Sequence, residues 1–398
     1  MRRTIAIAIA LLGVVAACSD QSPSSSSTSP NTGEPAAAVT TPVEGTTSPP
    51  PVTAADATPP ATTPATTTPA PTTEVVPVAG WEQVTAPSEC MCADGSPYSY
   101  WIHRGDPSKV VFFLEGGGAC VDAGTCNFGS PAYRHSIGAN DDPNDYSSGI
   151  FDFGDGRNPL ANYSFVFAPY CTGDVHLGTA THVYGPELTV QHKGSINAST
   201  ALKALAAEFP DTAQLVVTGE SAGSVPTPLY AGLAHDLLPE SAITVLADGS
   251  GAYPADPAVN ARVGELWGTE AAIPPWPENA GLTAADWGAP ELFVQAAKHD
   301  PQIIFGRHDY ANDFVQKIFS GLLGFPADDL VSTIDGNETQ IEAAGVDLRS
   351  YIAPGQGHTV LSTPAFYTET VEGVPLVDWV SDLIRRQPDP DVHCSQCT

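Results

Sequence analysis

The sequence predicts one α/β domain with a mostly parallel, doubly wound sheet, preceded by a long segment that has no core. From Trp81 onward, apolar runs of strand length alternate with stretches of helical periodicity. Several of these runs end in glycine-rich or polar corners, and no second linker interrupts residues 81–398. Such alternation favours parallel strands with helices on both faces, and ligands bind such sheets beyond the carboxyl ends of the strands.

Residues 1–17 have the features of a secretory signal peptide. Two arginines precede the apolar run "TIAIAIALLGVV", which is too short for a permanent membrane span. The run ends in "VAAC", and a cysteine directly after small residues resembles the signal of bacterial lipoproteins. We therefore expect Cys18 to carry lipid and to anchor the protein at the extracellular face of the cell envelope. A plain secretory signal that is cleaved nearby is the alternative.

Residues 18–80 consist almost wholly of Ser, Thr, Pro, Ala and Gly, as in "ATPPATTPATTTPAPTT". A segment with so little apolar surface cannot offset the conformational entropy that is lost on ordering. We expect a disordered, semi-rigid tether. The whole chain has 45 acidic and 15 basic residues and a formal charge of −30. This charge disfavours nucleic acid and anionic lipid as partners, so membrane contact is expected only through the N-terminal lipid.

Seven of the eight cysteines follow the tether, which suits an oxidising compartment. Cys120 and Cys126 are close enough in sequence to close a small loop. The cysteines of "CMC" at 90–92 and "CSQC" at 394–397 could pair with each other or locally, or their four thiolates could hold zinc. Zinc is the less favoured alternative in an exported domain, and an odd number of cysteines leaves at least one thiol free or intermolecular.

The predicted elements alternate along the domain in the way that a parallel sheet requires. Strands are expected at 109–118, where the strand runs into a glycine loop, and at 163–171, 214–219, 242–251, 301–309 and 347–358. Helices are expected at 194–208, from Ser221 to about 237, and at 375–386, where Leu376, Val380, Leu383 and Ile384 share one face.

The stretch Gly219-Glu220-Ser221-Ala222-Gly223 fits G-x-S-x-G between a predicted strand and a predicted helix. This is the context of a nucleophile elbow, where the serine adopts a strained backbone and larger side chains at the glycine positions would collide with neighbouring chain. Ser221 is the candidate nucleophile. In the alternative interpretation, the small residues serve only close packing of the helix.

A serine nucleophile needs a base that takes its proton and a third group that orients the base. His358 follows a predicted strand late in the chain, as the order serine, acid, histidine requires, and His308 at another strand end is its rival. The acid candidates are Asp248, Asp309 and Asp313, and sequence order and loop position allow all three. Asp309 or Asp313 could instead cap a helix.

Acyl transfer also needs hydrogen-bond donors for the oxyanion. One donor would be the backbone N–H of Ala222, directly after the nucleophile, and another should come from the loop "LEGGGAC" at 114–120. Glycines in this loop let backbone amides face a ligand. The alternative is a plain tight turn at 116–118.

A series of motifs resembles the pectin acetylesterase and Notum carboxylesterase family. In order, they are "FFLEGGGACVDAGTC", "PYCTGDVHLGT", "HKGSINASTAL", "GESAGS", "ADGSG", "DFVQKIF" and "YIAPGQGHTVL", and the resemblance covers nearly all of residues 90–386. It implies an α/β-hydrolase fold and a serine carboxylesterase that uses no metal and no cofactor. By position, it implies Ser221 as nucleophile, His358 as base, and Gly117, Gly118 and Ala222 as the oxyanion hole.

The resemblance also selects an acid, because the family's acid stands in a D-x-x-Q pattern. Asp313 to Gln316 fits this pattern and Asp309 does not, so Asp313 is predicted, with Asp309 second. The family also implies a Cys120–Cys126 bridge. Two departures are visible: many relatives have an aromatic residue where Gly118 stands, and the elbow has "SAGS" where "SAGG" is usual.

Residues 252–300 are too long for a plain connection, and we expect a cap over the site. Trp267, Trp276, Trp287 and Phe293 of this segment could line an acyl pocket, stack on sugar rings or form the cap's own core.

The predicted function is a lipid-anchored extracellular serine esterase that removes acetyl or other short acyl groups from a glycan or polysaccharide. One alternative is a deacylase for longer fatty acyl esters on lipid or protein. Another is a surface binding protein without turnover, which the intact Ser221, His358 and glycine loop disfavour.

Overall fold

The computed structural model describes residues 80–138, 141–325 and 328–397. The predicted signal peptide, the predicted lipid site at Cys18 and the predicted tether lie outside the described residues. Among the helices in the described ranges, none combines the length and the apolar character that a membrane span requires.

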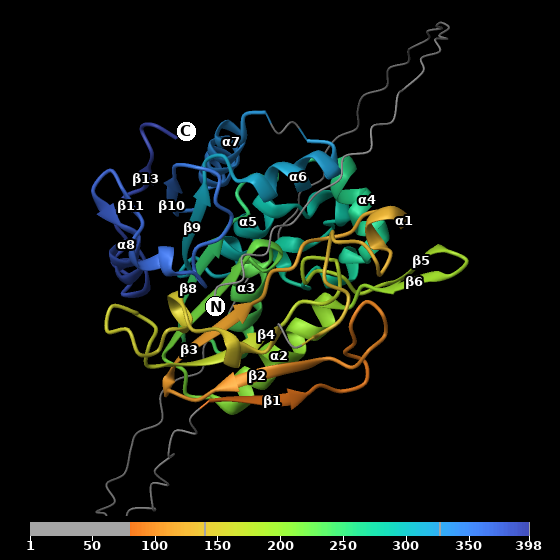
Figure 1. Cartoon of the computed structure of the whole chain (residues 1–398), viewed down its shortest axis with the longest axis horizontal. Helices are drawn as coiled ribbons and strands as arrows, with labels where there is room; N and C mark the ends of the chain where they lie inside the picture. Colours follow the sequence, from red (N-terminus) through yellow and green to blue (C-terminus); the bar gives the residue numbers. More distant parts are fainter. Residues whose placement is uncertain (1–79, 139–140, 326–327, 398) are drawn as a thin grey trace, which may run out of the picture. The chain divides into compact units, whose positions relative to one another are not determined.

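A sheet of nine strands forms the centre of the domain, in the order β1-β2-β4-β3-β7-β8-β9-β10-β13 (Figure 1). The seven strands from β4 to β13 in this order are parallel to one another, whereas β2 is antiparallel to both β4 and β1 at one edge. The predicted mostly parallel sheet is therefore confirmed. The strands are β1 Trp81–Thr85, β2 Ser99–His103, β3 Asp106–Leu114, β4 Tyr163–Ala168, β7 Gln214–Glu220, β8 Ala242–Asp248, β9 Ile304–Tyr310, β10 Leu348–Ala353 and β13 Val392–His393.

Helices cover both faces of the sheet. Along β3, Val110, Phe112 and Leu114 belong to one buried cluster, and Val111 and Phe113 belong to another, because successive side chains point to opposite faces. The longer helices are α2 Gly194–Glu208, α3 Thr227–Leu237, α4 Pro257–Trp267, α5 Ala289–His299, α6 Phe314–Leu323, α7 Leu330–Ala343 and α8 Leu376–Ile384. Residues of α2, α3 and α5 pack in the first cluster, and residues of α8 pack in the second, so the predicted double winding is present.

Short elements complete the domain. They are the helix α1 Ala123–Cys126, the hairpin β5 Thr181–Gly185 with β6 Leu188–Gln191, the hairpin β11 Thr370–Val371 with β12 Val374–Pro375, and the 3-10 helices η2 Pro143–Asp145, η3 Gly149–Phe151, η4 Ser221–Gly223, η5 Thr269–Ala272, η6 Pro277–Asn279, η7 Ala284–Asp286 and η8 Pro364–Tyr367.

The order of the strands places a crevice between β3 and β7. Strands β4 and β7 lie parallel to β3, one on each side of it. The chain therefore passes from β3 to β4 on one side and later returns to β7 on the other side. Loops that follow strands at such a reversal diverge, and ligands bind between them. The glycine loop follows β3 and Ser221 follows β7, so the fold brings these two predicted features to one place.

Disulfides resolve the pairings that the sequence left open. The described bridges are Cys92–Cys171, Cys120–Cys126 and Cys394–Cys397. "CSQC" therefore pairs locally, the Cys120–Cys126 bridge implied by the resemblance is present, and Cys90 is free and buried. The alternative of a four-thiolate zinc site is wrong, because three of its four sulfurs are engaged in disulfides.

Candidate active site

Ser221 begins a strained turn directly after β7. Its φ is +54°, in the left-handed region that non-glycine residues rarely adopt. A Cβ on Gly219 would lie 2.4 Å from Gly223 O, and a Cβ on Gly223 would lie 2.0 Å from Leu114 O. The flanking glycines are therefore needed because the turn packs against itself and against β3. This is the geometry predicted for the G-x-S-x-G stretch.

His358, in the loop after β10, is bonded to Asp313, in the loop after β9. The distance between His358 Nδ1 and Asp313 Oδ2 is 2.7 Å. Asp313 is fully buried and also accepts hydrogen bonds from the backbone N–H groups of Val315, at 2.8 Å, and Gln316, at 2.9 Å. The carboxylate of Asp313 therefore caps helix α6 and is also bonded to His358. From the residues alone, these two roles were alternatives.

The second ring nitrogen of His358, Nε2, has no hydrogen-bond partner among the described residues. Burial lowers the pKa of His358, but the bond to Asp313 and its charge outweigh burial and raise the pKa above its usual value. Among the described groups, none lies within hydrogen-bond distance of His358 Nε2, which is buried. Because Nδ1 faces a carboxylate, Nε2 of the neutral ring is the proton acceptor, and His358 lines the same cavity as Ser221.

Asp309, the second candidate for the acid, has other partners. Its Oδ2 lies 2.9 Å from Arg307 Nε, and its Oδ1 accepts from Gly251 N at 2.8 Å and from Gln316 Nε2 at 2.9 Å. Gln316 Nε2 also donates to Asp313 Oδ2 at 3.0 Å. The glutamine of the D-x-x-Q pattern therefore bridges both aspartates, and only Asp313 contacts His358.

Both ring nitrogens of His308, the rival base, are bonded to carboxylates. Its Nδ1 lies 2.7 Å from Asp248 Oδ1, its Nε2 lies 2.9 Å from Glu369 Oε1, and the side chain is fully buried. Burial lowers the pKa of His308, but the two carboxylates reverse this and raise it to about 10. Asp248, the third candidate for the acid, accepts from Val360 N at 2.8 Å and from Leu361 N at 3.0 Å with its other oxygen.

The glycine loop lies opposite Ser221. A Cβ on Gly116 would lie 2.9 Å from the Cβ of Ser221, and Gly118 has a φ of +80°. The loop is held by a hydrogen bond from Arg134 N to Gly117 O, at 2.9 Å, and by another from Ala119 N. These bonds do not use the amide hydrogens of Gly117 and Gly118. The loop therefore approaches Ser221 closely, and its role as an oxyanion hole stays a prediction.

Phe319 of α6 occupies the space beside Gly118. Its Cζ lies 3.2 Å from the position of a Cβ on Gly118, and such a Cβ would lie 2.0 Å from Ala132 O. A side chain at residue 118 is therefore excluded by the local backbone. An aromatic side chain of α6 therefore stands beside this glycine.

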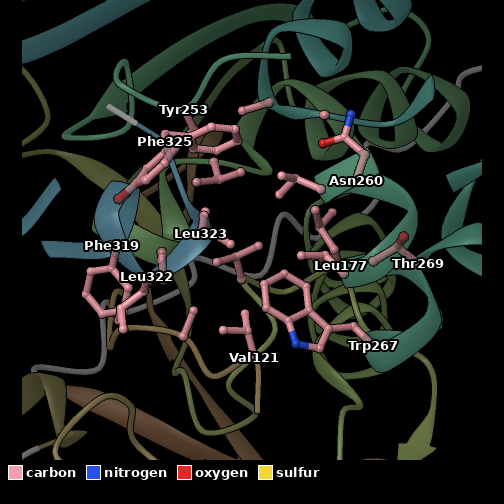
Figure 2. A pocket seen from close by; sticks show the side chains of 18 of the residues that line it. Val121, Leu177, Tyr253, Asn260, Trp267, Thr269, Phe319, Leu322, Leu323 and Phe325 are labelled. Atoms are coloured by element: carbon pink, nitrogen blue, oxygen red, sulfur yellow. The ribbon is translucent and has the colours of Figure 1, made fainter. Parts of the chain in front are cut away.

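Two cavities of different chemistry meet at Ser221, and Gly118 and Phe319 line both. The apolar cavity has about 970 Å³ of space with its open mouth included. Figure 2 shows side chains of α6 and the following segment on one side of it, and Leu177 and Trp267 on the other. The side chains labelled there are Val121, Leu177, Tyr253, Asn260, Trp267, Thr269, Phe319, Leu322, Leu323 and Phe325.

The polar cavity contains acidic, basic and hydroxyl groups. It is lined in part by Glu115, Arg134, Tyr146, Glu220, His358 and Ser362. Glu220 accepts from Ser362 N at 2.7 Å and from Ser362 Oγ at 3.0 Å, so it ties the elbow to the segment after His358. Burial and the charge of Asp248 raise the pKa of Glu220 to about 8.

The four aromatic residues of segment 252–300 divide into two pairs. Trp267 and Trp287 line the apolar cavity. Trp276 stacks on His299 with a centroid distance of 4.0 Å, and Phe293 packs in the main core, so these two stabilise the domain itself. The pocket residues of α6 were missed by the sequence analysis, although "DFVQKIF" and the apolar residues after it contain them.

In the described part of the chain, three groups of neighbouring residues have side chains of the types that can bind a metal. Two contain disulfide-bonded cysteines, Cys120 with Cys126 and Cys394 with Cys397, each beside a histidine. The third consists of the acidic residues Glu338, Glu342 and Asp391. None includes Ser221, His358 or Asp313.

The parallel sheet with helices on both faces, and the serine elbow at its reversal point, define an α/β-hydrolase fold. Residues 80–262 match the family model described as pectinacetylesterase. A solved structure of the Wnt deacylase Notum from Drosophila matches with a TM-score of 0.56 and 17% identity, over 80% of this chain and 97% of that chain. A comparison with curated proteins found no match.

These comparisons confirm the resemblance predicted from the motifs. At 17% identity the Notum structure shows the fold. The pectinacetylesterase match indicates a carboxylesterase-type hydrolase that acts on acyl groups, and such an enzyme implies an ester-bearing substrate.

Proposed function

We propose that this protein is a serine carboxylesterase in which Ser221 is the nucleophile, His358 the base and Asp313 the group that orients the base. One observation carries the proposal. Ser221, on its strained turn, lines the same cavity as His358, whose Nδ1 is bonded to the buried Asp313 and whose Nε2 is open.

In the proposed mechanism, Ser221 Oγ attacks the ester carbonyl while His358 Nε2 accepts the hydroxyl proton. The backbone N–H groups of Gly117, Gly118 and Ala222 stabilise the oxyanion. The protonated His358 then gives its proton to the leaving alcohol. Water, deprotonated by the same nitrogen, attacks the acyl-enzyme and releases the carboxylic acid and free Ser221.

The apolar cavity supports an acyl group longer than acetyl, because an acetyl group would leave most of its lining without contact. The leaving alcohol then occupies the polar cavity, where it can form hydrogen bonds. Of the predicted activities, removal of longer acyl esters is thus the better supported. Removal of acetyl groups from a glycan is the second candidate, and the pectinacetylesterase match supports it.

Labelling with a fluorophosphonate probe tests the nucleophile. The full chain is expected to be labelled, and Ser221→Ala and His358→Ala are expected to be unlabelled because each removes a partner of the attack. A wild-type chain that is folded and remains unlabelled overturns the proposed function.

A series of p-nitrophenyl esters of rising chain length separates the two substrate candidates. We expect kcat/KM to rise from acetate to longer chains, and Val263→Trp, which fills the apolar cavity, to reduce turnover of the long esters at least about tenfold. Val183→Trp on the β5–β6 hairpin is the control. Activity confined to acetate in the wild type favours the glycan acetylesterase.

The lipid anchor at Cys18 is also part of the proposal, supported by the sequence "VAAC". Cys18→Ala is expected to move the protein from the membrane fraction to the medium of an expressing bacterial cell. An unchanged distribution contradicts the anchor and leaves the esterase proposal intact.

A further inference from the structure

Helix α6 carries an exposed apolar stripe. Phe314, Ile318 and Leu322 are 53%, 42% and 41% exposed. They are four residues apart, so they lie on one face of the helix. In the described part of the chain, five large hydrophobic side chains are exposed, and the other two, Val183 and Leu237, are isolated from this stripe in sequence.

The helix is inverted relative to an ordinary surface helix. Its buried residues are polar: Gln316 contacts Asp309 and Asp313, and Ser320 Oγ donates to Ala252 O at 3.3 Å. An amphipathic helix normally buries its apolar face and exposes its polar face. Folding of the domain therefore does not account for Phe314, Ile318 and Leu322, since these three side chains are exposed.

The charge of α6 is equally unusual for this chain. It contains no acidic residue and one basic residue, Lys317, within a protein that has 45 acidic residues. Each of the other described helices of eight or more residues contains at least one Asp or Glu. The stripe thus presents an uncharged surface on an otherwise acidic molecule, and large exposed apolar patches mark interaction sites.

The stripe is continuous with the apolar cavity beside Ser221. Leu322 belongs to the exposed stripe and also lines that cavity, where Figure 2 shows it near Phe319. Phe319 lines both cavities. An apolar chain that leaves the cavity at Leu322 therefore reaches the exposed face of α6 without crossing charged surface.

We propose that the exposed face of α6 docks on an uncharged or zwitterionic lipid surface, from which acyl esters enter the apolar cavity. This inference rests on the proposed function. It adds a second membrane contact to the one expected through the N-terminal lipid. The lack of acidic groups on α6 permits approach to a neutral surface, whereas the net charge of −30 opposes approach to an anionic one.

Flotation with phosphatidylcholine vesicles tests the docking. All chains are full length and carry Cys18→Ser, which removes the expected lipid, and Ser221→Ala, which removes turnover. The double variant Phe314→Ser/Ile318→Ser is compared with the matched control Val183→Ser/Leu237→Ser. Leu322 is left in place because it lines the cavity. We expect the partition coefficient of the α6 variant to fall at least about tenfold below that of the parent and the control.

Equal binding of the parent and the α6 variant, or no binding by the parent, overturns the proposal. Stronger binding to phosphatidylglycerol vesicles than to phosphatidylcholine vesicles overturns the proposal that the lipid surface is uncharged or zwitterionic. Light scattering tests whether a second copy of this chain binds the exposed face of α6 in place of lipid. A parent that is a dimer, with an α6 variant that is a monomer, also overturns the proposal. Circular dichroism verifies that all variants have the same Tm.

Kinetics separate failure of the docking from failure of the proposed function. With Ser221 restored, the α6 variant is expected to lose at least about tenfold in turnover of p-nitrophenyl palmitate in neutral detergent micelles. It should keep its turnover of dissolved p-nitrophenyl acetate. Equal palmitate turnover in parent and variant overturns the docking alone. A parent that hydrolyses neither ester overturns the proposed function, while flotation still decides the docking.

Discussion

Two histidine–aspartate pairs stand at the carboxyl ends of neighbouring strands, and their first bonds are the same length. His358 Nδ1 to Asp313 and His308 Nδ1 to Asp248 each measure 2.7 Å. They differ at the second ring nitrogen. Nε2 of His308 is bonded to Glu369, whereas Nε2 of His358 has no partner in the described part of the chain and the ring lines the cavity at Ser221.

The comparison shows that a histidine–carboxylate bond does not by itself mark a base. Two carboxylates hold His308 as a buried cation, which can stabilise the fold but has no lone pair to offer. One carboxylate leaves His358 with a nitrogen that can accept a proton. The same pairing therefore yields a structural ion group in one place and a candidate catalytic group in the other.

The largest expected effect is the loss of activity on substitution of His358, which we do not expect on substitution of His308. His358→Gln should lower kcat/KM for a p-nitrophenyl ester about 10⁴-fold, because no group is left to take the proton of Ser221. The free energy of unfolding should change by less than about 1 kcal/mol, since the ring lies at a cavity. Steady-state kinetics and urea denaturation measure both. Retention of most activity would assign the base to another residue.

The next effect separates the aspartates. Asp313→Asn should reduce kcat/KM about 10³-fold, because the amide cannot orient and stabilise the protonated His358. Asp309→Asn is the matched control, since Gln316 contacts both residues but only Asp313 contacts His358. A greater loss of activity in the Asp309 variant at equal folded fraction contradicts the assignment.

A smaller effect, on stability, is expected at His308. His308→Gln should lower the free energy of unfolding by about 3 kcal/mol, because Asp248 and Glu369 lose the cation between them. The activity of the folded fraction should remain within about threefold. A thermal or urea transition at the wild-type position would show that the buried cation does not stabilise the fold.

The same pair makes stability depend on pH with a definite sign. The pKa of His308 is about 10 in the folded state, against 6.5 as its ordinary value. Its stabilisation is therefore complete below about pH 6.5 and is lost as pH rises towards 10, because only the folded state holds the proton in that window. Urea denaturation at a series of pH values should show this decline in the wild type and a weaker decline in His308→Gln.

The smallest effect concerns the pH profile of activity. Asp313 raises the pKa of His358 above its ordinary value, so kcat/KM should rise with pH with a midpoint above 6.5. In Asp313→Asn the residual activity should have its midpoint at lower pH, since the anion that favours the charged ring is gone. A midpoint that does not move would mean that another group controls the profile.

Local motifs allowed much of this site to be predicted from the sequence. The positions of Ser221, His358 and the glycine loop could be predicted because each follows a strand, and the ends of parallel strands converge at one edge of the sheet. Its position after a predicted strand made Asp313 a candidate acid, and the D-x-x-Q pattern of the resemblance selected it. Its bond to His358 agrees with that choice, although 45 residues separate the two in sequence.

Long-range contacts were beyond the sequence analysis. His308 looked like a rival base because Glu369, which closes its second nitrogen, lies 61 residues away. The pocket aromatics Trp267 and Trp287 could not be told from Trp276 and Phe293, because position in three dimensions decides between lining and core. The inverted orientation of α6 was likewise hidden, since only contacts show which face is buried.

The carboxylate of Asp248 links the two histidine sites through its two oxygens. The second oxygen accepts the amides of Val360 and Leu361, just after His358, while the first oxygen holds His308. The segment that carries His358 is therefore fastened to the centre of the sheet and cannot open without disturbing the buried cation. In hydrogen exchange these two amides should behave as members of the most slowly opening unit of the domain. A designer who transplants this loop to another hydrolase must move Asp248 with it, because its second oxygen accepts both amides.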